Sequence, residues 1–278
     1  MPELPEVETV AKTLATQILN KEIKDVDVFY DKMLKNCSVQ ELRDVLIENS
    51  VQSMSRRGKY LIFELKHGYL LSHLRMEGKY FYEARDVKPT KHVHLVLTFL
   101  DETQLFYEDT RKFGTFHYFE TREQLESSRE FSVLGVEPMS ELFTVDHVAR
   151  GIKNKKKPIK SLLLDQSVVV GLGNIYVDEV LFGANLHPLT PSHLVTPTQM
   201  EQIIVQTNKV LGKAIELKGT TIRTFASAHG SGNYQHYLRV HQREKEACLT
   251  CGETIVKIKV GGRGTYYCPQ CQPLHKES

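Results

Sequence analysis

Hydrophobic residues recur with two different periods along the chain, and the change between them predicts an α+β fold. In residues 1–20, Val7, Val10, Leu14 and Ile18 are spaced as on one face of a helix, behind a start that is rich in proline and glutamate. From residue 59 to about residue 119, short apolar and β-branched runs alternate with turn residues, which is typical of an antiparallel sandwich or barrel. The expected strands cover residues 60–65, 69–74, 79–82, 92–99, 104–107 and 115–119.

Helical patterns replace the strands after about residue 135, and the clearest covers residues 196–217. Thr196 and Gln199 have the spacing of a capping box, Pro197 occupies the first helical position, and Gly219 follows the end. One apolar stripe runs along this helix, and we expect it to lie in the core. It contains Met200, Ile203, Ile204, Leu211, Ala214 and Ile215.

Length and composition allow two modest domains and a small terminal module. The chain has 278 residues, of which 41% are hydrophobic and 25% charged, as in ordinary globular proteins. We predict a β-sandwich over residues 1–134, a helical domain over 135–236 and a cysteine-bearing hairpin over 237–273. The absence of a long apolar stretch and of a basic, apolar leader leads us to expect a cytoplasmic protein.

Net charge alone does not indicate a nucleic-acid partner, because it is only +2. The charge is unevenly distributed, however. Residues 151–160 are rich in lysine and contain no acidic residue, whereas residues 2–8 contain glutamates and no base. A solvated surface is the simpler interpretation of the lysine run when it is considered by itself.

Four cysteines near the C-terminus have the spacing of a zinc ribbon. Two C-x-x-C turns, Cys248 with Cys251 and Cys268 with Cys271, flank residues 252–267, which alternate as a β-hairpin does. Each turn can offer two thiolates, and the hairpin would complete a closed tetrahedral set, so we expect one structural Zn²⁺ ion. Disulfides or a redox motif are the competing interpretation. Cys37 stands apart and is expected to be an inert, partly buried thiol.

Three separated blocks resemble one family. They are MPELPEVET at residues 1–9, GLGNIYVDE at 171–179 and GRGTYYCPQCQ at 262–272. Together they are similar to formamidopyrimidine-DNA glycosylase, the bacterial enzyme that removes 8-oxoguanine and then cuts the strand. Weaker matches at 56–60, 109–114 and 219–225 follow in the expected order, so the resemblance covers nearly the whole chain. It implies an N-terminal sandwich, a helix-two-turn-helix domain and a zinc hairpin.

The resemblance also implies which residues are catalytic. Once Met1 is removed, Pro2 would attack the sugar C1′ through its secondary amine, which titrates near pH 8 and is therefore partly unprotonated. Glu3 would act as a general acid and base while the base leaves and the sugar ring opens. Lys59 would neutralise developing charge and donate a proton during strand cleavage. Arg263, on the hairpin turn, would hold the phosphate at the lesion and assist the second elimination.

DNA contacts are implied at further positions. A base must leave the duplex before it can be excised, and the family fills the gap with three side chains, which match Met76, Arg111 and Phe113 here. Met76 and Phe113 could instead be core residues. The other matching DNA contacts are His92, Lys156 and Asn174. Residues 219–221 and 230–234 match the family's lesion-capping loop.

One departure from the family precedes the first zinc cysteine. Where the family usually has Val-Tyr-Gly-Arg-x-Gly-x-Pro-Cys, residues 240–248 read VHQREKEAC, which puts the geometry of this linker in doubt.

Two other functions stay open at this point. One is the related endonuclease VIII, which excises oxidised pyrimidines; the other is a noncatalytic zinc-dependent DNA-binding protein. We expect a monomer that acts on double-stranded DNA and has no membrane partner.

Overall fold

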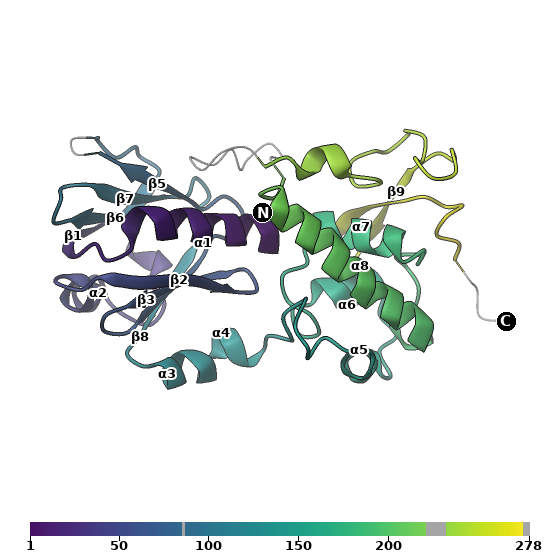
Figure 1. Cartoon of the computed structure of the whole chain (residues 1–278), viewed down its shortest axis with the longest axis horizontal. Helices are drawn as coiled ribbons and strands as arrows, with labels where there is room; N and C mark the ends of the chain where they lie inside the picture. Colours follow the sequence, from purple (N-terminus) through teal and green to yellow (C-terminus); the bar gives the residue numbers. More distant parts are fainter. Residues whose placement is uncertain (85–86, 221–231, 275–278) are drawn as a thin grey trace. The chain divides into compact units, whose positions relative to one another are not determined.

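The computed structural model describes residues 1–84, 87–220 and 232–274, which form two compact units (Figure 1). The first unit comprises residues 1–132 together with 218–232, and the second comprises 133–217 with 233–278. Among the described residues, we find no helix with the length and hydropathy needed to cross a membrane.

Two four-stranded antiparallel sheets form the first unit. Their strand orders are β1-β6-β7-β5 and β2-β3-β4-β8. Aromatic rings from the two sheets meet in the core: Phe63 lies 5.7 Å from Tyr80, and Tyr107 lies 4.9 Å from Phe116. The elements are α1 (Leu4–Ile18), β1 (Ile23–Val28), η1 (Asp31–Met33), α2 (Val39–Leu46), β2 (Val51–Arg57), β3 (Tyr60–Leu65), β4 (Tyr69–His73), β5 (Lys79–Glu83), β6 (Val93–Phe99), β7 (Gln104–Glu108), β8 (Thr115–Phe119), α3 (Arg122–Ser127) and α4 (Arg129–Ser132).

Helices and one hairpin form the second unit. Helix α8 packs against α7 and α5, and the hairpin strand β10 packs against α7. The elements are α5 (Val145–Ile152), α6 (Ile159–Leu164), α7 (Asn174–Gly183), η2 (Ser192–Leu194), α8 (Pro197–Glu216), η3 (Tyr234–Tyr237), β9 (Val256–Val260) and β10 (Arg263–Tyr267).

The structure confirms the predicted α+β fold, with an antiparallel sandwich, an N-terminal helix, a helical part and a terminal hairpin. The capping box of Thr196 and Gln199 opens α8 as expected, and β3 and β8 have the predicted bounds. Strands β1 and β2 and helix α2 were not predicted. Three of the six residues of β1 are charged and five of the seven residues of β2 are polar or charged, so neither segment shows a long apolar alternation.

A buried ion pair ties the second unit together. Lys160 in α6 and Asp178 in α7 are fully buried, and Lys160 Nζ lies 2.7 Å from Asp178 Oδ1. Lys160 also donates to Thr265 Oγ1 in β10 at 2.8 Å. The second oxygen of Asp178 lies 2.8 Å from His241 Nδ1 and accepts from the Tyr266 amide. The pair therefore links both helices to the hairpin and to the chain that leads into it.

We expect Lys160→Met to lower the free energy of unfolding by about 3–5 kcal/mol, because it leaves a buried carboxylate without its cation. Lys157→Met is the matched control: its pair with Asp165 is more than a third exposed, so its loss should cost at most about 1 kcal/mol. Denaturant unfolding measures both values. Equal losses in the two variants would show that the buried pair contributes no more than a surface pair.

Candidate functional site

The N-terminal segment is held rigidly where the chain enters α1. Pro2 and Glu3 are buried, and Glu3 caps the helix. Its backbone amide donates to Glu6 Oε2 at 2.9 Å, which completes a capping box. The predicted nucleophile is therefore followed directly by a fixed turn, so its orientation is set by the helix.

Glu6 also holds the segment that follows α8. Its Oε1 accepts from the amide of Thr220 at 2.8 Å and from the hydroxyl at 3.2 Å. Gly219 has φ +78°, and a Cβ there would lie 2.5 Å from Glu6 Oε1, so only glycine allows this approach. Most of the predicted lesion-capping loop, residues 221–231, lies outside the described residues.

Lys59 lies in the tight turn between β2 and β3 and is only 7% exposed. Burial and then the charges of Arg75 and Lys59 lower the pKa of His73 to about 3. His73 is therefore neutral at physiological pH, and its Nδ1 accepts from the Arg75 amide at 2.9 Å. Sequence reasoning did not single out His73, because one histidine at a strand end is usually structural.

The predicted gap-filling residues lie on two turns of the sandwich. Met76 is 37% exposed and Phe113 is 51% exposed, so neither is a core residue. The Arg111 guanidinium lies over the Phe113 ring, 4.6 Å from its centroid. His92 immediately precedes β6, and its carbonyl accepts from the Asp109 amide at 2.9 Å. The structure thus brings His92 and the Arg111–Phe113 turn to the same strand ends.

In the second unit, Asn174 lies beside the first residues of β10. Asn174 is the first residue of α7, and its Nδ2 donates to the Gly264 carbonyl at 2.9 Å. Arg263 is exposed and begins β10 directly after Gly261 and Gly262, both of which have positive φ. Such a two-residue turn favours glycine and suits the twist of a hairpin. Lys156 is exposed between α5 and α6.

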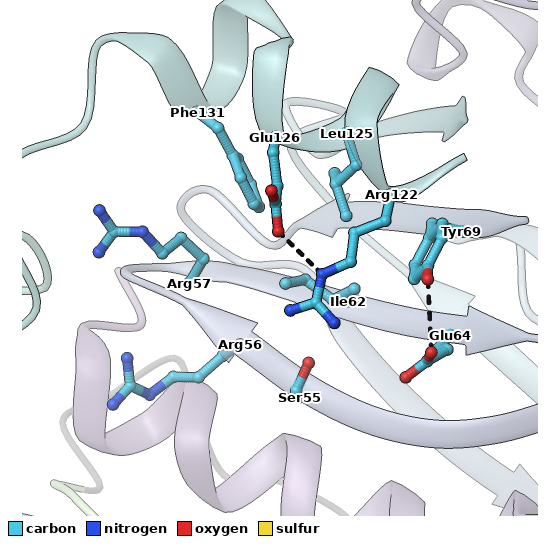
Figure 2. A pocket seen from close by; sticks show the side chains of 10 residues that line it. All are labelled: Ser55, Arg56, Arg57, Ile62, Glu64, Tyr69, Arg122, Leu125, Glu126 and Phe131. Carbon is cyan, nitrogen blue, oxygen red and sulfur yellow. Dashed lines mark hydrogen bonds and ion pairs between the residues drawn. The ribbon is translucent and has the colours of Figure 1, made fainter. Parts of the chain in front are cut away.

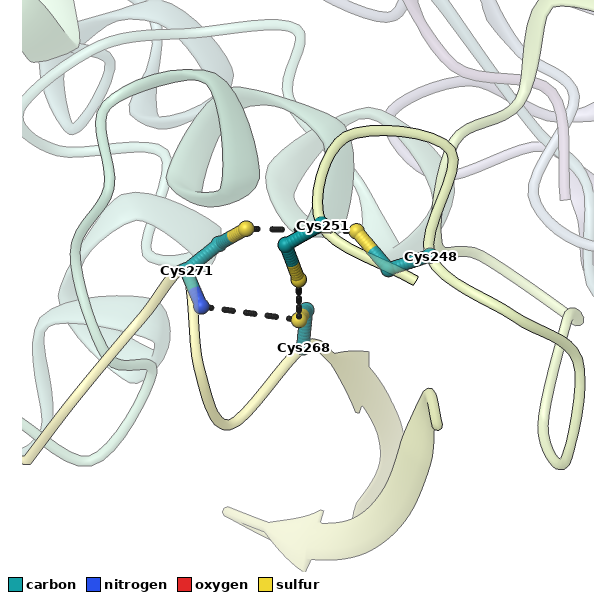
Figure 3. Close-up of side chains that lie close together, drawn as sticks. All are labelled: Cys248, Cys251, Cys268 and Cys271. Atoms are coloured by element: carbon teal, nitrogen blue, oxygen red, sulfur yellow. Dashed lines mark hydrogen bonds between the residues drawn. The ribbon is translucent and has the colours of Figure 1, made fainter. Parts of the chain in front are cut away.

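The four C-terminal cysteines form a compact metal site (Figure 3). All four sulfur atoms lie within 4.8 Å of one another. Cys248 Sγ is 3.9 Å from Cys271 Sγ, and Cys251 Sγ is 3.5 Å from Cys268 Sγ. These distances are far longer than a disulfide bond and close to the edge of about 3.8 Å expected of a Zn–S₄ tetrahedron. The donor set therefore fits one structural Zn²⁺ ion, as the sequence predicts.

The start of the linker that departs from the family, residues 240–248, is anchored to helix α7. Glu179 in α7 is fully buried, and its carboxylate accepts from the amides of Arg239, Val240 and His241 at 2.9–3.0 Å. His241 takes the place of the family's usual tyrosine and contacts the Tyr266 ring edge-on at 5.0 Å. The start of the linker thus has a defined geometry despite its changed sequence.

A pocket of about 440 Å³ lies in the first unit between β2, β3 and helices α3 and α4 (Figure 2). Arg122 on its wall pairs with Glu126, and Arg56 pairs with Glu8. The Phe131 and Leu125 side chains form its apolar part. None of the sequence-predicted site residues lines it, so we do not assign the reaction to this pocket.

Three family models match successive parts of the chain. The formamidopyrimidine-DNA glycosylase N-terminal domain matches residues 1–116, and the H2TH domain of the same family matches residues 134–226. The zinc finger found in FPG and IleRS matches residues 245–274. The three matches follow the order expected from the sequence blocks.

Relatives and solved structures are similar over nearly the full length. Formamidopyrimidine-DNA glycosylases from Mycoplasma pneumoniae and Streptococcus pneumoniae are each 45% identical, with 98% of this chain and 99% of theirs covered. The Lactococcus lactis Fpg bound to DNA with an abasic site is 40% identical, with a TM-score of 0.92. MutM bound to DNA with carbocyclic 8-oxo-G is 39% identical, also with a TM-score of 0.92. Both structures cover 98% of this chain and are covered completely.

We expect one zinc ion per chain, measured by elemental analysis. Cys248→Ala should lose it and expose the hairpin to limited proteolysis, since the site would keep only three of its four ligands. The sandwich should stay folded because it lies in the other unit. Cys37→Ala is the control, because Cys37 packs beside the sandwich core. Full zinc content in Cys248→Ala would contradict the assignment.

Proposed function

Because the chain belongs to the formamidopyrimidine-DNA glycosylase family, we propose that it excises oxidised purines from duplex DNA and then cleaves the strand at the abasic site. The substrates are 8-oxoguanine and formamidopyrimidines. The observation that carries this proposal is the match of three family models to residues 1–116, 134–226 and 245–274. The sequence resemblance adds Pro2, Glu3, Lys59 and Arg263 as the residues expected to be catalytic. The enzyme acts on DNA in the cytoplasm, at the nucleoid.

Pro2 is the proposed nucleophile. Its nitrogen attacks C1′ of the damaged nucleotide, the glycosidic bond breaks, and the base leaves with a proton. The C1′–O4′ bond then breaks and O4′ takes up a proton, which leaves a cationic iminium between the secondary amine and C1′. This positive charge promotes elimination of the 3′ and then the 5′ phosphate. Met1 must be removed first, because a proline nitrogen in a peptide bond has no available lone pair. The mass of the purified protein tests that removal.

Glu3, Lys59 and Arg263 assist in different ways. The buried carboxylate of Glu3 transfers protons as the base leaves and the sugar ring opens. Lys59 holds a flanking phosphate and donates a proton during strand cleavage, for which its largely buried ammonium is suited by weak solvent screening. Arg263 binds the phosphate at the lesion from the hairpin turn.

The remaining predicted residues bind DNA. Met76, Arg111 and Phe113 fill the gap that the extruded base leaves, and the exposure of all three side chains supports this role. Asn174, at the start of a ten-residue helix, binds phosphate where the helix dipole is positive. Lys156 and His92 add backbone contacts. The zinc ion stabilises the fold of the hairpin. It has four cysteine ligands and does not bind the substrate.

Borohydride should trap the enzyme on a duplex that contains 8-oxoguanine, because it reduces the iminium to a stable amine. Peptide mapping should place the crosslink on Pro2. Pro2→Gly retains only a primary amine and should react more slowly, whereas Pro5→Ala should still crosslink fully, since Pro5 contributes no amine.

The same experiment is repeated on a duplex that contains an oxidised pyrimidine, and three outcomes would contradict the proposal. A crosslink found only on a lysine would exclude Pro2 as nucleophile. Faster reaction on a duplex with an oxidised pyrimidine would favour an enzyme similar to endonuclease VIII. Binding of both duplexes without any cleavage would indicate a noncatalytic DNA-binding protein.

Phe113→Ala should slow excision from an intact 8-oxoguanine duplex on the order of tenfold, because the side chain offsets part of the cost of unstacking. Cleavage of a duplex with a preformed abasic site should change much less, since no base has to be extruded. Phe29→Ala is the control, because Phe29 is similarly exposed, at 59%, on the same unit. Equal losses on both substrates would exclude the gap-filling role. Single-turnover rates of the unchanged protein and of both variants, measured on each of the two substrates, provide the comparison.

A further inference from the structure

Asp109 is a buried carboxylate around which the Arg111–Phe113 turn is wrapped. It follows β7 directly and is 1% exposed. Its Oδ1 accepts from the Arg111 amide at 3.0 Å, and its Oδ2 accepts from the amides of Phe113 and Gly114, each at 2.8 Å. Three hydrogen bonds from main-chain amides to this carboxylate fix the path of the turn, and none of them uses a side chain of residues 111–114.

The backbone of Asp109 is itself anchored to β6. Its amide donates to the His92 carbonyl at 2.9 Å, and its carbonyl lies 2.8 Å from His94 Nε2. The carbonyl also accepts from the Lys112 amide at 3.2 Å, where Lys112 has φ +58°. The carboxylate is thus attached to the sheet, so it holds the turn in place rather than moving with it.

The hydroxyl of Tyr107 connects this turn to the one that carries Met76. It lies 3.5 Å from Asp109 Oδ2, at the limit of a hydrogen bond. A Cβ at Gly114 would lie 1.6 Å from the hydroxyl oxygen, and one at Gly78 would lie 2.5 Å from it. Gly114 from one turn and Gly78 from the other therefore both pack closely against the Tyr107 hydroxyl oxygen.

The Tyr107 ring cannot shift easily, because it lies in a cluster of tilted and edge-on aromatic rings in the core. Its centroid is 5.2 Å from that of Tyr80 and 4.9 Å from that of Phe116. Burial, followed by the charge of Asp109, raises the pKa of Tyr107. The hydroxyl stays protonated at physiological pH and can donate toward the carboxylate.

We propose that Asp109 and Tyr107 are positioning residues that set the two gap-filling turns at a fixed spacing, so that Met76 and the Arg111–Phe113 pair enter the duplex as one preformed wedge. This inference rests on the proposed gap-filling function. Preformed loops matter here because ordering a flexible turn during base extrusion would cost free energy at the step that already includes unstacking.

The test compares Asp109→Asn and Tyr107→Phe with the unchanged protein on two substrates. Asparagine has nearly the same size as aspartate, but it replaces one acceptor oxygen with a donor that faces backbone amides. Excision from an intact 8-oxoguanine duplex should fall on the order of tenfold for Asp109→Asn and less for Tyr107→Phe. Cleavage at a preformed abasic site should stay within about twofold for both variants.

Tyr80→Phe is the matched control. Its ring belongs to the same aromatic cluster, but its hydroxyl donates to Ser72 Oγ at 2.8 Å and not to Asp109. It should leave both rates unchanged. In the double variant Asp109→Asn with Phe113→Ala, excision should be no slower than in the worse single variant, because Asp109 acts through the position of Phe113.

The outcomes separate this inference from the proposed function. Slow excision by Phe113→Ala together with normal excision by Asp109→Asn and Tyr107→Phe would overturn the positioning role alone. Equal losses on both substrates, with a lower melting temperature, would overturn it as well by showing a general loss of stability. Normal excision by Phe113→Ala would remove the gap-filling function and the positioning role with it. If Asp109→Asn does not fold, the positioning role is decided by the two rates of Tyr107→Phe, on the intact duplex and on the abasic-site duplex.

Discussion

The cost of burying a carboxylate is the constraint on which this structure most depends. A buried carboxylate must be paired or fully hydrogen-bonded, or it destabilises the fold by several kcal/mol. Asp109, Asp178, Glu179 and Glu6 are all buried, and each meets this requirement by holding chain segments together. Glu179 and Asp109 bind backbone amides, Asp178 binds Lys160, and Glu6 binds Thr220.

This arrangement explains how irregular segments keep a defined shape. The Arg111–Phe113 turn, the linker after residue 238 and the segment after α8 do not rely on sheet or helix hydrogen bonds for all their amides. Each is instead held by one acidic side chain: Asp109, which directly follows β7, Glu179 in α7, or Glu6 in α1. The residues that we propose to contact DNA can then lie on loops, where they are accessible, while buried carboxylates fix the loops in position.

The sequence predicted the architecture well wherever a period or a spacing was strong. Helix α8 had a capping box and an apolar stripe, and the cysteines had the spacing of a zinc ribbon. The prediction missed β1, which is short and half charged, and β2, in which five of seven residues are polar or charged. The proposed roles of Pro2, Lys59 and Phe113 came from resemblance to a family, since no period or spacing marks them.

The carboxylates that hold the loops could not be found in this way. Asp109 and Glu179 look like ordinary acidic residues in the sequence, and their function depends on amides that only the folded chain brings within 3 Å. His73 is a similar case, because its neutral state follows from burial and from the charges of Arg75 and Lys59. Contacts of this kind are properties of the tertiary structure.

Recognition of main-chain amides by Glu179 also bears on how such a protein can diverge. Every residue except proline presents the same backbone amide, so these three hydrogen bonds do not require particular side chains at residues 239–241, although the Arg239 guanidinium adds an ion pair with Glu179 at 3.5 Å. A lineage could therefore replace a tyrosine by His241 and lose the neighbouring glycines and proline one substitution at a time. The anchoring carboxylate lies on the helix and not in the linker, so evolutionary drift in the linker leaves its attachment intact.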